Sequence, residues 1–262
     1  MQKLRQVFRW LRYFGQMLVR APGVWNRWNV LCCIGRMVAA QAGWHGKPRQ
    51  YHLRLDGAVF NVVAERRDLT PYPPIWIDGE YEPEGFVPRA GQTVVDVGAQ
   101  VGFYTIRAAW AVGPTGRVFS LEPDPVTFLL LEANVRDNGL QNVRVINAAC
   151  GAVDGSVFFD AQPHSVNSRI LTHPASGGIE VRCTTLNNLV RSEGIERIDV
   201  LKLDAECAEM DILSCAEAVL PCVQSVIIEI HRTDWEPIVD QIMARHGLRK
   251  VGVQYVHYYS RL

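Results

Sequence analysis

The most informative stretch of this 262-residue chain is Val94-Val95-Asp96-Val97-Gly98-Ala99-Gln100-Val101-Gly102-Phe103-Tyr104-Thr105. It opens with a mostly apolar run that is typical of a buried strand, and the apolar spacing after Gly102 is typical of a helix. Gly98 would allow a sharp backbone turn against a ligand, and Gly102 would let the helix pack closely. The stretch therefore predicts a strand, a tight turn and a helix.

Strands and helices continue to alternate after residue 91. Further strands are predicted at 117–121, 143–147, 198–203 and 225–230, with β structure also over 156–185 and 251–259. Helices are predicted at 125–138, 186–193 and 233–247, the last from a capping box that begins at Thr233. This alternation indicates a mostly parallel, doubly wound α/β sheet, which binds ligands at the carboxyl ends of its strands.

Polar residues mark the ends of the first three predicted strands. Asp96 lies in the first, Glu122-Pro123 follows the second and Asn147 ends the third. A carboxylate placed like Glu122 can accept both hydroxyls of a ribose, and Asn147 would bond the edge of a flat base. Gln100 occupies a position where the dinucleotide fingerprint requires glycine, which argues against a nicotinamide oxidoreductase. These positions predict a nucleoside ligand without a phosphate group.

Ionisable residues gather at the next two strand ends. Lys202, Asp204 and Glu206 follow one another at alternate positions, and Glu229 and His231 do the same in the following strand. An ionisable side chain in a buried strand is costly unless it is paired. The two groups therefore indicate a reaction centre or, as the alternative, a structural network of ion pairs.

The first 55 residues differ in charge from the rest of the chain. They hold ten of the 27 basic residues and none of the 27 acidic ones, which leaves 17 basic against 27 acidic residues and a net charge of −10 for 56–262. A chain whose overall net charge is zero is not expected to coat nucleic acid. We therefore expect no nucleic-acid partner.

Residues 4–18 have the spacing of an amphipathic helix. Its apolar face holds Leu4, Val7, Phe8, Leu11, Phe14 and Leu18. Such a face either lies on a membrane surface or packs on its own domain or on a second subunit, so residues 1–45 are candidates for peripheral membrane contact or self-association. No secretory signal or spanning segment is visible, and the seven cysteines form no C-x-x-C motif. We expect reduced thiols and a cytoplasmic protein, with the inner membrane surface as the alternative location.

Three segments are expected along the chain. They are a basic amphipathic helical extension at 1–48, a connector at 49–90 and an α/β domain at 91–262. The connector begins with a β-hairpin around the turn Asp56-Gly57 and continues through a proline-rich loop at 68–90. The polar segment 162–178 and the N-terminal helices are expected to shape a site for a substrate that binds beside the nucleoside ligand.

Taken together, these motifs resemble S-adenosylmethionine-dependent methyltransferases of the FkbM type. The resemblance rests on 95–105, 121–125, 134, 138–140, 184–186, 198–206 and 229–231. It implies a class I methyltransferase fold, which is a Rossmann-like, mostly parallel seven-stranded sheet. It also implies O-methylation of a hydroxyl on a sugar, glycolipid or natural product, so that the partner is a small-molecule or glycan acceptor.

The resemblance also implies a cofactor site for S-adenosylmethionine. Its methionine end would lie against Asp96, Gly98 and Gly102, and its ribose against Glu122. The full set of residues expected at the cofactor is Asp96, Gly98, Ala99, Gln100, Gly102, Glu122, Pro123 and Asn147.

A hydroxyl is a poor nucleophile, so methyl transfer to it benefits from a general base. His231 is the first choice because its unperturbed pKa lies near neutrality. Asp204 would orient His231 or share its role, and Lys202 would keep Asp204 ionised or contact the acceptor. Glu206 and Glu229 are expected to bind substrate hydroxyls. A divalent metal held by these carboxylates and the histidine is an alternative, but no metal site is predicted.

Three positions depart from the FkbM pattern. Cys207 replaces the glycine of Asp-x-Glu-Gly-x-Glu, Gln100 replaces an asparagine, and Asn187 stands where aspartate is common. If the replaced glycine has a positive φ, the turn at Cys207 is strained or rebuilt. Cys207 and Asn187 also leave open a second class of function, a catalytically weak or inactive S-adenosylmethionine-binding module that acts as an interaction or membrane-peripheral protein.

Overall fold

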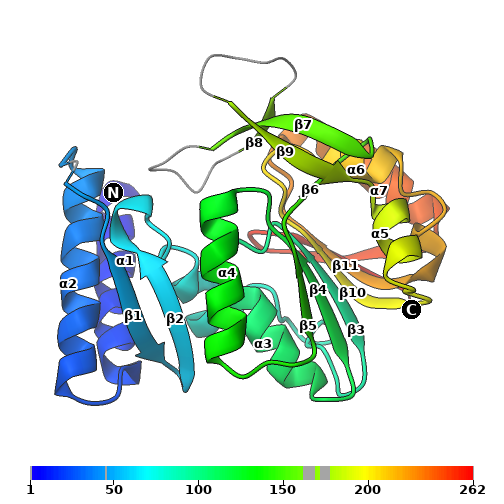
Figure 1. The fold of residues 1–262 in the computed structure, drawn as a ribbon. Helices are drawn as coiled ribbons and strands as arrows, with labels where there is room; N and C mark the ends of the chain where they lie inside the picture. Colours follow the sequence, from blue (N-terminus) through cyan, green and yellow to red (C-terminus); the bar gives the residue numbers. More distant parts are fainter. Residues whose placement is uncertain (1, 45, 162–168, 172–177, 262) are drawn as a thin grey trace.

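The computed structural model describes residues 2–44, 46–161, 169–171 and 178–261 (Figure 1). Within them, a seven-stranded sheet has the order β12-β13-β11-β10-β3-β4-β5. The strands are β3 (Thr93–Val97), β4 (Arg117–Leu121), β5 (Val143–Ile146), β10 (Ile198–Leu203), β11 (Val223–Ile228), β12 (Arg249–Val253) and β13 (His257–Ser260). Among these strands, β13 runs antiparallel to its two neighbours β11 and β12, and the other neighbouring pairs are parallel. The predicted mostly parallel sheet is confirmed.

Both faces of this sheet are covered, as the apolar runs of its strands require. The covering helices are α3 (Phe103–Val112), α4 (Pro125–Asp137), α5 (Leu186–Ser192), α6 (Glu209–Ser214) and α7 (Glu236–Arg245). Val94 belongs to one hydrophobic core, which includes residues of α3, whereas its neighbour Val95 belongs to a second core with α5, α6 and α7. This alternation follows from the two-residue period of a strand.

The order in which strands are added to the sheet changes direction at β3. The chain adds β4 and β5 on one side, then returns to place β10 and β11 on the other. Val97 at the end of β3 pairs with Leu121 of β4 and with Leu203 of β10. The loops after these three strands therefore leave the sheet side by side, at the point where open α/β sheets hold their ligands.

Two helices and a hairpin precede the sheet. They are α1 (Gln2–Arg20), α2 (Val24–Gln41), β1 (Gln50–Leu55) and β2 (Ala58–Val63), and they lie beside α4 (Figure 1). Asp56 and Gly57 both have positive φ, as a two-residue hairpin turn requires. The hairpin is fastened to α4 because Asn61 Nδ2 donates to Asn134 Oδ1 at 3.0 Å and Val59 N donates to Asn138 Oδ1 at 2.9 Å.

Three local predictions differ from the structure. The proline-rich loop at 68–90 contains the short helical turn η2 (Pro73–Ile77), because its two prolines fit the first turn of a helix, and the short turn η1 (Ala64–Arg66) precedes the loop. The predicted capping box is wrong, since Thr233–Trp235 form the 3-10 turn η4 and α7 begins at Glu236 without a side-chain cap.

The third difference lies in the segment predicted as irregular β structure. It forms a separate four-stranded sheet of order β6-β9-β7-β8. Its strands are β6 (Ala149–Cys150), β7 (Gly155–Asp160), β8 (Arg169–Leu171) and β9 (Ile179–Thr184). Most of the polar segment expected to shape a substrate site, 162–168 and 172–177, lies outside the described residues.

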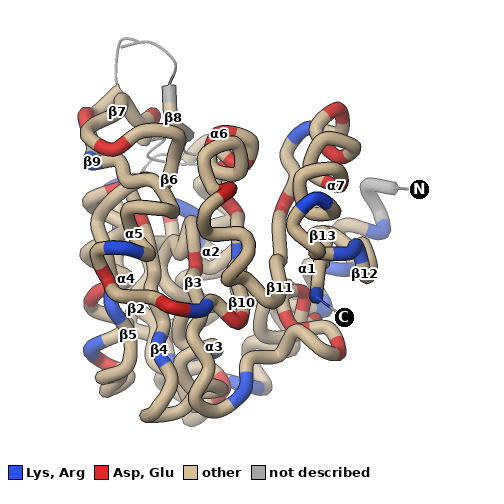
Figure 2. The backbone as a smooth tube through the Cα atoms, turned by 90° about the vertical axis from the view of Figure 1, so that its right-hand side faces the viewer, with Lys and Arg blue, Asp and Glu red and all other residues tan. Residues whose placement is uncertain are grey.

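The N-terminal helices α1 and α2 contain basic residues and no acidic ones. No acidic residue occurs before Asp56 in the sequence, and in Figure 2 the acidic residues mark the sheet, its helices and the connector. All seven cysteines have free thiols. None of the described helices combines the length and apolar character that crossing a bilayer demands.

Candidate active site

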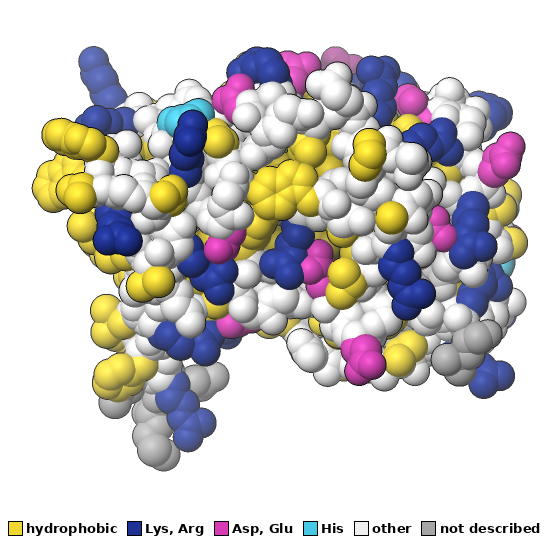
Figure 3. Space-filling model, turned by 90° about the horizontal axis from the view of Figure 1, so that it is seen from below, with side chains coloured by type: hydrophobic (Ala, Val, Ile, Leu, Met, Phe, Trp, Pro, Cys, Tyr) yellow, Lys and Arg dark blue, Asp and Glu magenta, His cyan; other side chains and the backbone are white. Residues whose placement is uncertain are grey.

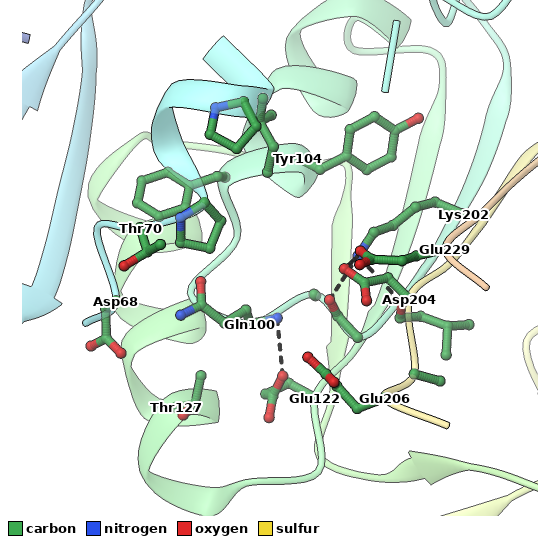
Figure 4. A pocket seen from close by; sticks show the side chains of 18 of the residues that line it. Asp68, Thr70, Gln100, Tyr104, Glu122, Thr127, Lys202, Asp204, Glu206 and Glu229 are labelled. Atoms are coloured by element: carbon green, nitrogen blue, oxygen red, sulfur yellow. Dashed lines mark hydrogen bonds and ion pairs between the residues drawn. The ribbon is translucent and has the colours of Figure 1, made fainter. Parts of the chain in front are cut away.

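A cavity of about 580 Å³ opens at the carboxyl ends of β3, β4 and β10 (Figure 4). Its size is typical of small-molecule sites. Five of the eight residues expected at the cofactor line it, namely Gly98, Ala99, Gln100, Glu122 and Pro123. The other three, Asp96, Gly102 and Asn147, lie outside the lining.

Gly98 sits where the loops after β3 and β10 touch. Its φ is +77°, and a Cβ built on it would lie 1.8 Å from the backbone oxygen of Asp204. Only glycine fits this position. The sequence predicted that the backbone of Gly98 lies against a ligand, but the atom that excludes a larger residue belongs to the loop after β10. Gly102 lies outside the cavity lining, where a Cβ would meet Leu131 of α4 at 2.6 Å.

Asp96 is fully buried and also lies outside the lining. It accepts a hydrogen bond from Thr105 Oγ1 at 2.7 Å, and Lys202 Nζ lies 3.1 Å from its other carboxylate oxygen. Lys202 Nζ also donates to the Gly98 carbonyl at 2.8 Å and lies 3.5 Å from Asp204. Burial lowers the pKa of Lys202, but Asp96 and Asp204 outweigh burial and raise it. Lys202 is thus a buried cation that joins the ends of β3 and β10.

Glu122 is held by the backbone on both of its carboxylate oxygens. Gln100 N donates to Oε2 and Asp124 N donates to Oε1, each at 2.9 Å. Burial raises the pKa of Glu122 to about 8, against the opposing effect of these donors. Asn147 is exposed and lies outside this cavity, where its Nδ2 donates to the carbonyls of Glu122 and Pro123 at 2.8 and 3.2 Å. Asn147 therefore fixes the loop that carries Glu122.

Small residues form the wall beside Glu122. Ala148, Ala149 and Cys150 line the cavity there, and they leave room for a flat ring. A buried carboxylate next to a wall of small side chains suits a ribose and its attached base. This half of the cavity fits the nucleoside part of S-adenosylmethionine.

Ionisable side chains collect on the other side of the cavity. Figure 4 shows Lys202, Asp204 and Glu229 close together there. Tyr81 of the connector donates to Asp204 Oδ2 at 3.1 Å, and its ring centroid lies 5.4 Å from Lys202 Nζ. The connector therefore closes over this end of the cavity.

His231 is surrounded by carboxylates. Its Nδ1 lies 2.9 Å from Glu209 Oε1, and its Nε2 lies 3.3 Å from Glu206 Oε2 and 3.7 Å from Glu229 Oε1. Partial burial lowers the pKa of His231, but the hydrogen bonds to Glu206 and Glu209 outweigh burial and raise it to about 11. At neutral pH His231 therefore carries a proton, in contrast to the neutral base expected from the sequence.

Sequence reasoning missed the role of Glu209. This fully buried side chain accepts from Ala205 N at 3.1 Å, from Cys207 N at 3.3 Å and from His231. It thus shapes the loop after β10 and holds His231, which follows the end of β11. Its position as the last acidic residue of Asp-x-Glu-x-x-Glu was the available signal.

The turn after β10 keeps a glycine-like backbone although cysteine replaces the glycine. Cys207 has a φ of 77°, and Glu206 before it has a φ of 47°. A left-handed conformation costs an ordinary residue about 1–2 kcal/mol. The turn is therefore strained and has not been rebuilt. Asn187, another departure, donates to the Cys215 carbonyl at 2.6 Å and lies outside the cavity lining.

Replacing Cys207 by glycine is expected to raise the free energy of unfolding by about 0.5–1 kcal/mol, because the relief of strain exceeds the entropy that glycine adds to the unfolded chain. Urea denaturation measures this change. Cys222, which lies in a 3-10 turn, supplies the control, since Cys222→Gly should be destabilising. A Cys207→Gly variant less stable than the parent would show that the turn is not strained.

Three side chains of the cavity could hold a divalent metal. Asp204, Glu206 and His231 each offer a ligand atom, and these atoms lie within 4.8 Å of one another. Carboxylates and imidazole suit several such ions, but a protonated imidazole must first lose its proton. The absence of a metal requirement stays a prediction, which activity after exhaustive chelation tests.

A family model described as the FkbM methyltransferase domain matches residues 96–250. Hexuronic acid methyltransferase AglP of Haloferax volcanii is 29% identical over 138 residues, which cover 52% of this chain and 54% of AglP. The 31-O-demethyl-FK506 methyltransferase FkbM of Streptomyces tacrolimicus is 27% identical over 215 residues, which cover 70% of this chain and 82% of that protein. The chain thus spans about half the length of AglP.

The fold agrees with a solved structure. The crystal structure of methyltransferase FkbM from Methylobacillus flagellatus superposes with a TM-score of 0.50 at 14% sequence identity, and the match covers 98% of this chain and 60% of that one. At this identity the likeness concerns the fold alone.

Proposed function

This chain belongs to the FkbM family of S-adenosylmethionine-dependent methyltransferases, and on that basis we propose that it methylates a hydroxyl of a sugar, glycolipid or natural product. The main support is the carboxylate-rich end of the cavity, where Asp204, Glu206 and Glu229 face the open space. Carboxylates accept hydrogen bonds from hydroxyl groups. The names of two relatives, which refer to a hexuronic acid and to an FK506 derivative, agree with such an acceptor.

We assign the cofactor to the half of the cavity around Glu122. Glu122 would accept the ribose hydroxyls, Ala148 and Ala149 would face the base, and Gly98 would lie beside the methionine part. Lys202, which lines the cavity, holds the Gly98 loop through the Gly98 carbonyl, and Asp96 supports Lys202 from behind the lining. When bound, S-adenosylmethionine supplies a methyl group on a positively charged sulfur, so the leaving group needs no acid. The protein's remaining tasks are to align the acceptor oxygen and to remove its proton.

We propose that Glu229 removes this proton, in place of His231. A protonated imidazole cannot accept a proton, and His231 is protonated at neutral pH. Burial, and then the charge of Asp204, raises the pKa of Glu229, which makes it a stronger base than an ordinary carboxylate. His231 Nε2 lies 3.7 Å from Glu229, so the imidazolium would orient the carboxylate and limit its repulsion with Asp204.

Replacing Glu229 by glutamine should lower kcat by about 10²–10³-fold while the affinity for S-adenosylhomocysteine stays within threefold (~0.7 kcal/mol). The ionised carboxylate is the base, so the kcat of the parent enzyme should rise with pH through the raised pKa of Glu229, and the variant should lose this dependence. The partly exposed Glu236, paired with Lys250 at 2.6 Å, gives the control Glu236→Gln. An unchanged kcat in Glu229→Gln would show that Glu229 is not the general base.

The proposed function is tested by incubating the protein and S-adenosylmethionine with a panel of glycans, glycolipids and polyketides. We expect one methyl group on a hydroxyl oxygen of at least one acceptor, located by tandem mass spectrometry. Methylation at nitrogen, carbon or a carboxyl group alone would contradict the proposal. Cofactor binding without turnover on any acceptor would favour the inactive module.

A further inference from the structure

The outer surface of α1 and α2 exposes a set of large apolar side chains, which we call the α1–α2 face. It consists of Val7, Phe8, Leu11, Val19, Val24, Trp25, Trp28, Leu31 and Val38. Trp25 is 83% exposed and Phe8 is 62% exposed. Figure 3 shows hydrophobic side chains gathered at the left edge of the molecule, the side on which α1 and α2 lie in Figure 1.

The orientation of α1 explains why this face is open. Tyr13 and Met17 are buried, and they are the only buried residues among the side chains of α1 that the structure describes, from Arg5 to Arg20. Arg12 Nη2 donates to Asp78 of the connector at 2.8 Å, and the Tyr13 hydroxyl also donates to Asp78. These contacts turn the side of α1 that carries Tyr13 and Met17 toward the domain, and not the side that carries Phe8 and Leu11. The expectation that the predicted apolar face packs on its own domain is wrong for Val7, Phe8 and Leu11, and the side chain of Leu4 lies outside the described part.

The second helix has the same arrangement. α2 buries Val30, Cys33, Ile34 and Met37 against the domain, and both of its tryptophans are exposed. Monomeric proteins rarely expose an apolar area of this kind without a partner. Tryptophan is the side chain most characteristic of the boundary between water and lipid.

The charges around the face select the kind of partner. Arg5 and Arg12 lie next to Phe8 at the helical spacings of three and four residues, and Arg27 lies between the two tryptophans in sequence. Arg5 and Arg27 are exposed, and Arg12 keeps 54% of its side chain exposed beside Asp78. Neither helix contains an acidic residue. The partner must therefore accept apolar side chains and carry negative charge.

We propose that the α1–α2 face docks on the surface of an anionic bilayer, with its tryptophans among the lipid headgroups and its arginines near the phosphates. A two-fold dimer through this face is a poorer match, because it would bring together two copies of the same basic surface, and neither helix has an acidic residue to pair with the arginines. Gln6, Arg9 and Trp10 of α1 also line the cavity. Docking would thus hold the cavity next to the membrane, which, if the proposed function holds, suits an acceptor carried by lipid.

Sedimentation of the full chain with vesicles tests the docking independently of methyl transfer. We expect binding to vesicles of equal parts phosphatidylcholine and phosphatidylglycerol, and at least about tenfold weaker binding to phosphatidylcholine alone or at high salt. The double variant Trp25→Ser/Trp28→Ser should bind the anionic vesicles about tenfold less than the parent. The matched control Ile238→Ser/Val251→Ser removes exposed apolar side chains from α7 and β12 and should bind like the parent.

Quenching of tryptophan fluorescence by brominated lipids provides a second readout on the unaltered protein. We expect quenching in the parent and its loss in the tryptophan double variant, whose melting temperature should not change because both side chains are exposed. Should the double variant fail to fold, the single variants Trp25→Phe and Trp28→Phe locate the quenched residues. A parent that stays in solution with anionic vesicles would overturn the proposal, as would a dimer that the double variant turns into a monomer.

Discussion

Replacing Gly98 by alanine is expected to lower the free energy of unfolding by about 3 kcal/mol or more. The methyl group would lie 1.8 Å from the Asp204 carbonyl oxygen, and the backbone would hold an alanine at a φ of +77°. Overpacking costs about 1–3 kcal/mol, and the left-handed conformation adds about 1–2 kcal/mol. Urea denaturation measures the loss, and the affinity for S-adenosylhomocysteine should fall with it because the loops after β3 and β10 must separate.

Gly139 provides the matched control. Its φ is +67°, but a Cβ built on it would meet nothing within 4 Å. Gly139→Ala should therefore cost only the backbone term of about 1–2 kcal/mol. The difference between the two variants isolates the contact between the loops. Equal losses would show that the two loops do not touch in the folded protein.

Replacing Glu122 by alanine should weaken the binding of S-adenosylhomocysteine by about 10²-fold. A carboxylate that accepts hydrogen bonds from ligand hydroxyls contributes about 1.5–3 kcal/mol, and its removal also frees the Gln100 and Asp124 amides that it fixes. Calorimetric titration measures the affinity. Glu132→Ala, at an exposed position of α4, should bind like the parent. A Glu122→Ala variant with unchanged affinity would mean that the ribose lies elsewhere.

The pH dependence of this binding has a defined sign. Because burial raises the pKa of Glu122 to about 8, the carboxyl is largely protonated below that pH and ionised above it. The ionised form is the better acceptor for ribose hydroxyls, so the affinity of the parent should rise as the pH increases through 8. Glu122→Gln cannot ionise and should lose this dependence.

The fold could be predicted from the sequence because its signals are local. β4 and β10 have the bounds that the sequence predicts for them, and the turn at Asp56-Gly57 has the backbone that this residue pair favours. The alternation of strands with helices leaves few topologies open. The sequence also indicated that Gly98 and Gly102 are positions without room for a side chain. The atoms that fill this room, from Asp204 and Leu131, became clear only from the structure.

The chemistry of the site depends on contacts that the sequence does not encode locally. Lys202 and Asp96 are Cα partners across β10 and β3, so their ion pair follows from the strand register and not from their spacing. The protonated state of His231 arises because Glu206 and Glu209, from the preceding loop and helix, bond to its ring. An isolated histidine at a strand end gives no hint of these neighbours.

The orientation of α1 is the other feature that periodicity could not determine. The helix has an apolar face wide enough to pack in several ways, and the contacts of Arg12 and Tyr13 with Asp78, more than sixty residues away, select one of them. Amphipathic spacing therefore predicted the helix, but not which part of its apolar face is buried.

The central claim is that the nucleoside of S-adenosylmethionine lies between the Gly98 loop and Glu122. A crystal structure of the chain with S-adenosylhomocysteine tests it most directly. We predict both ribose hydroxyls within hydrogen-bond distance of the Glu122 carboxylate and the base against Ala148 and Ala149. A ligand bound elsewhere, or a ribose held by another residue while Glu122 keeps only its two backbone donors, would contradict the account.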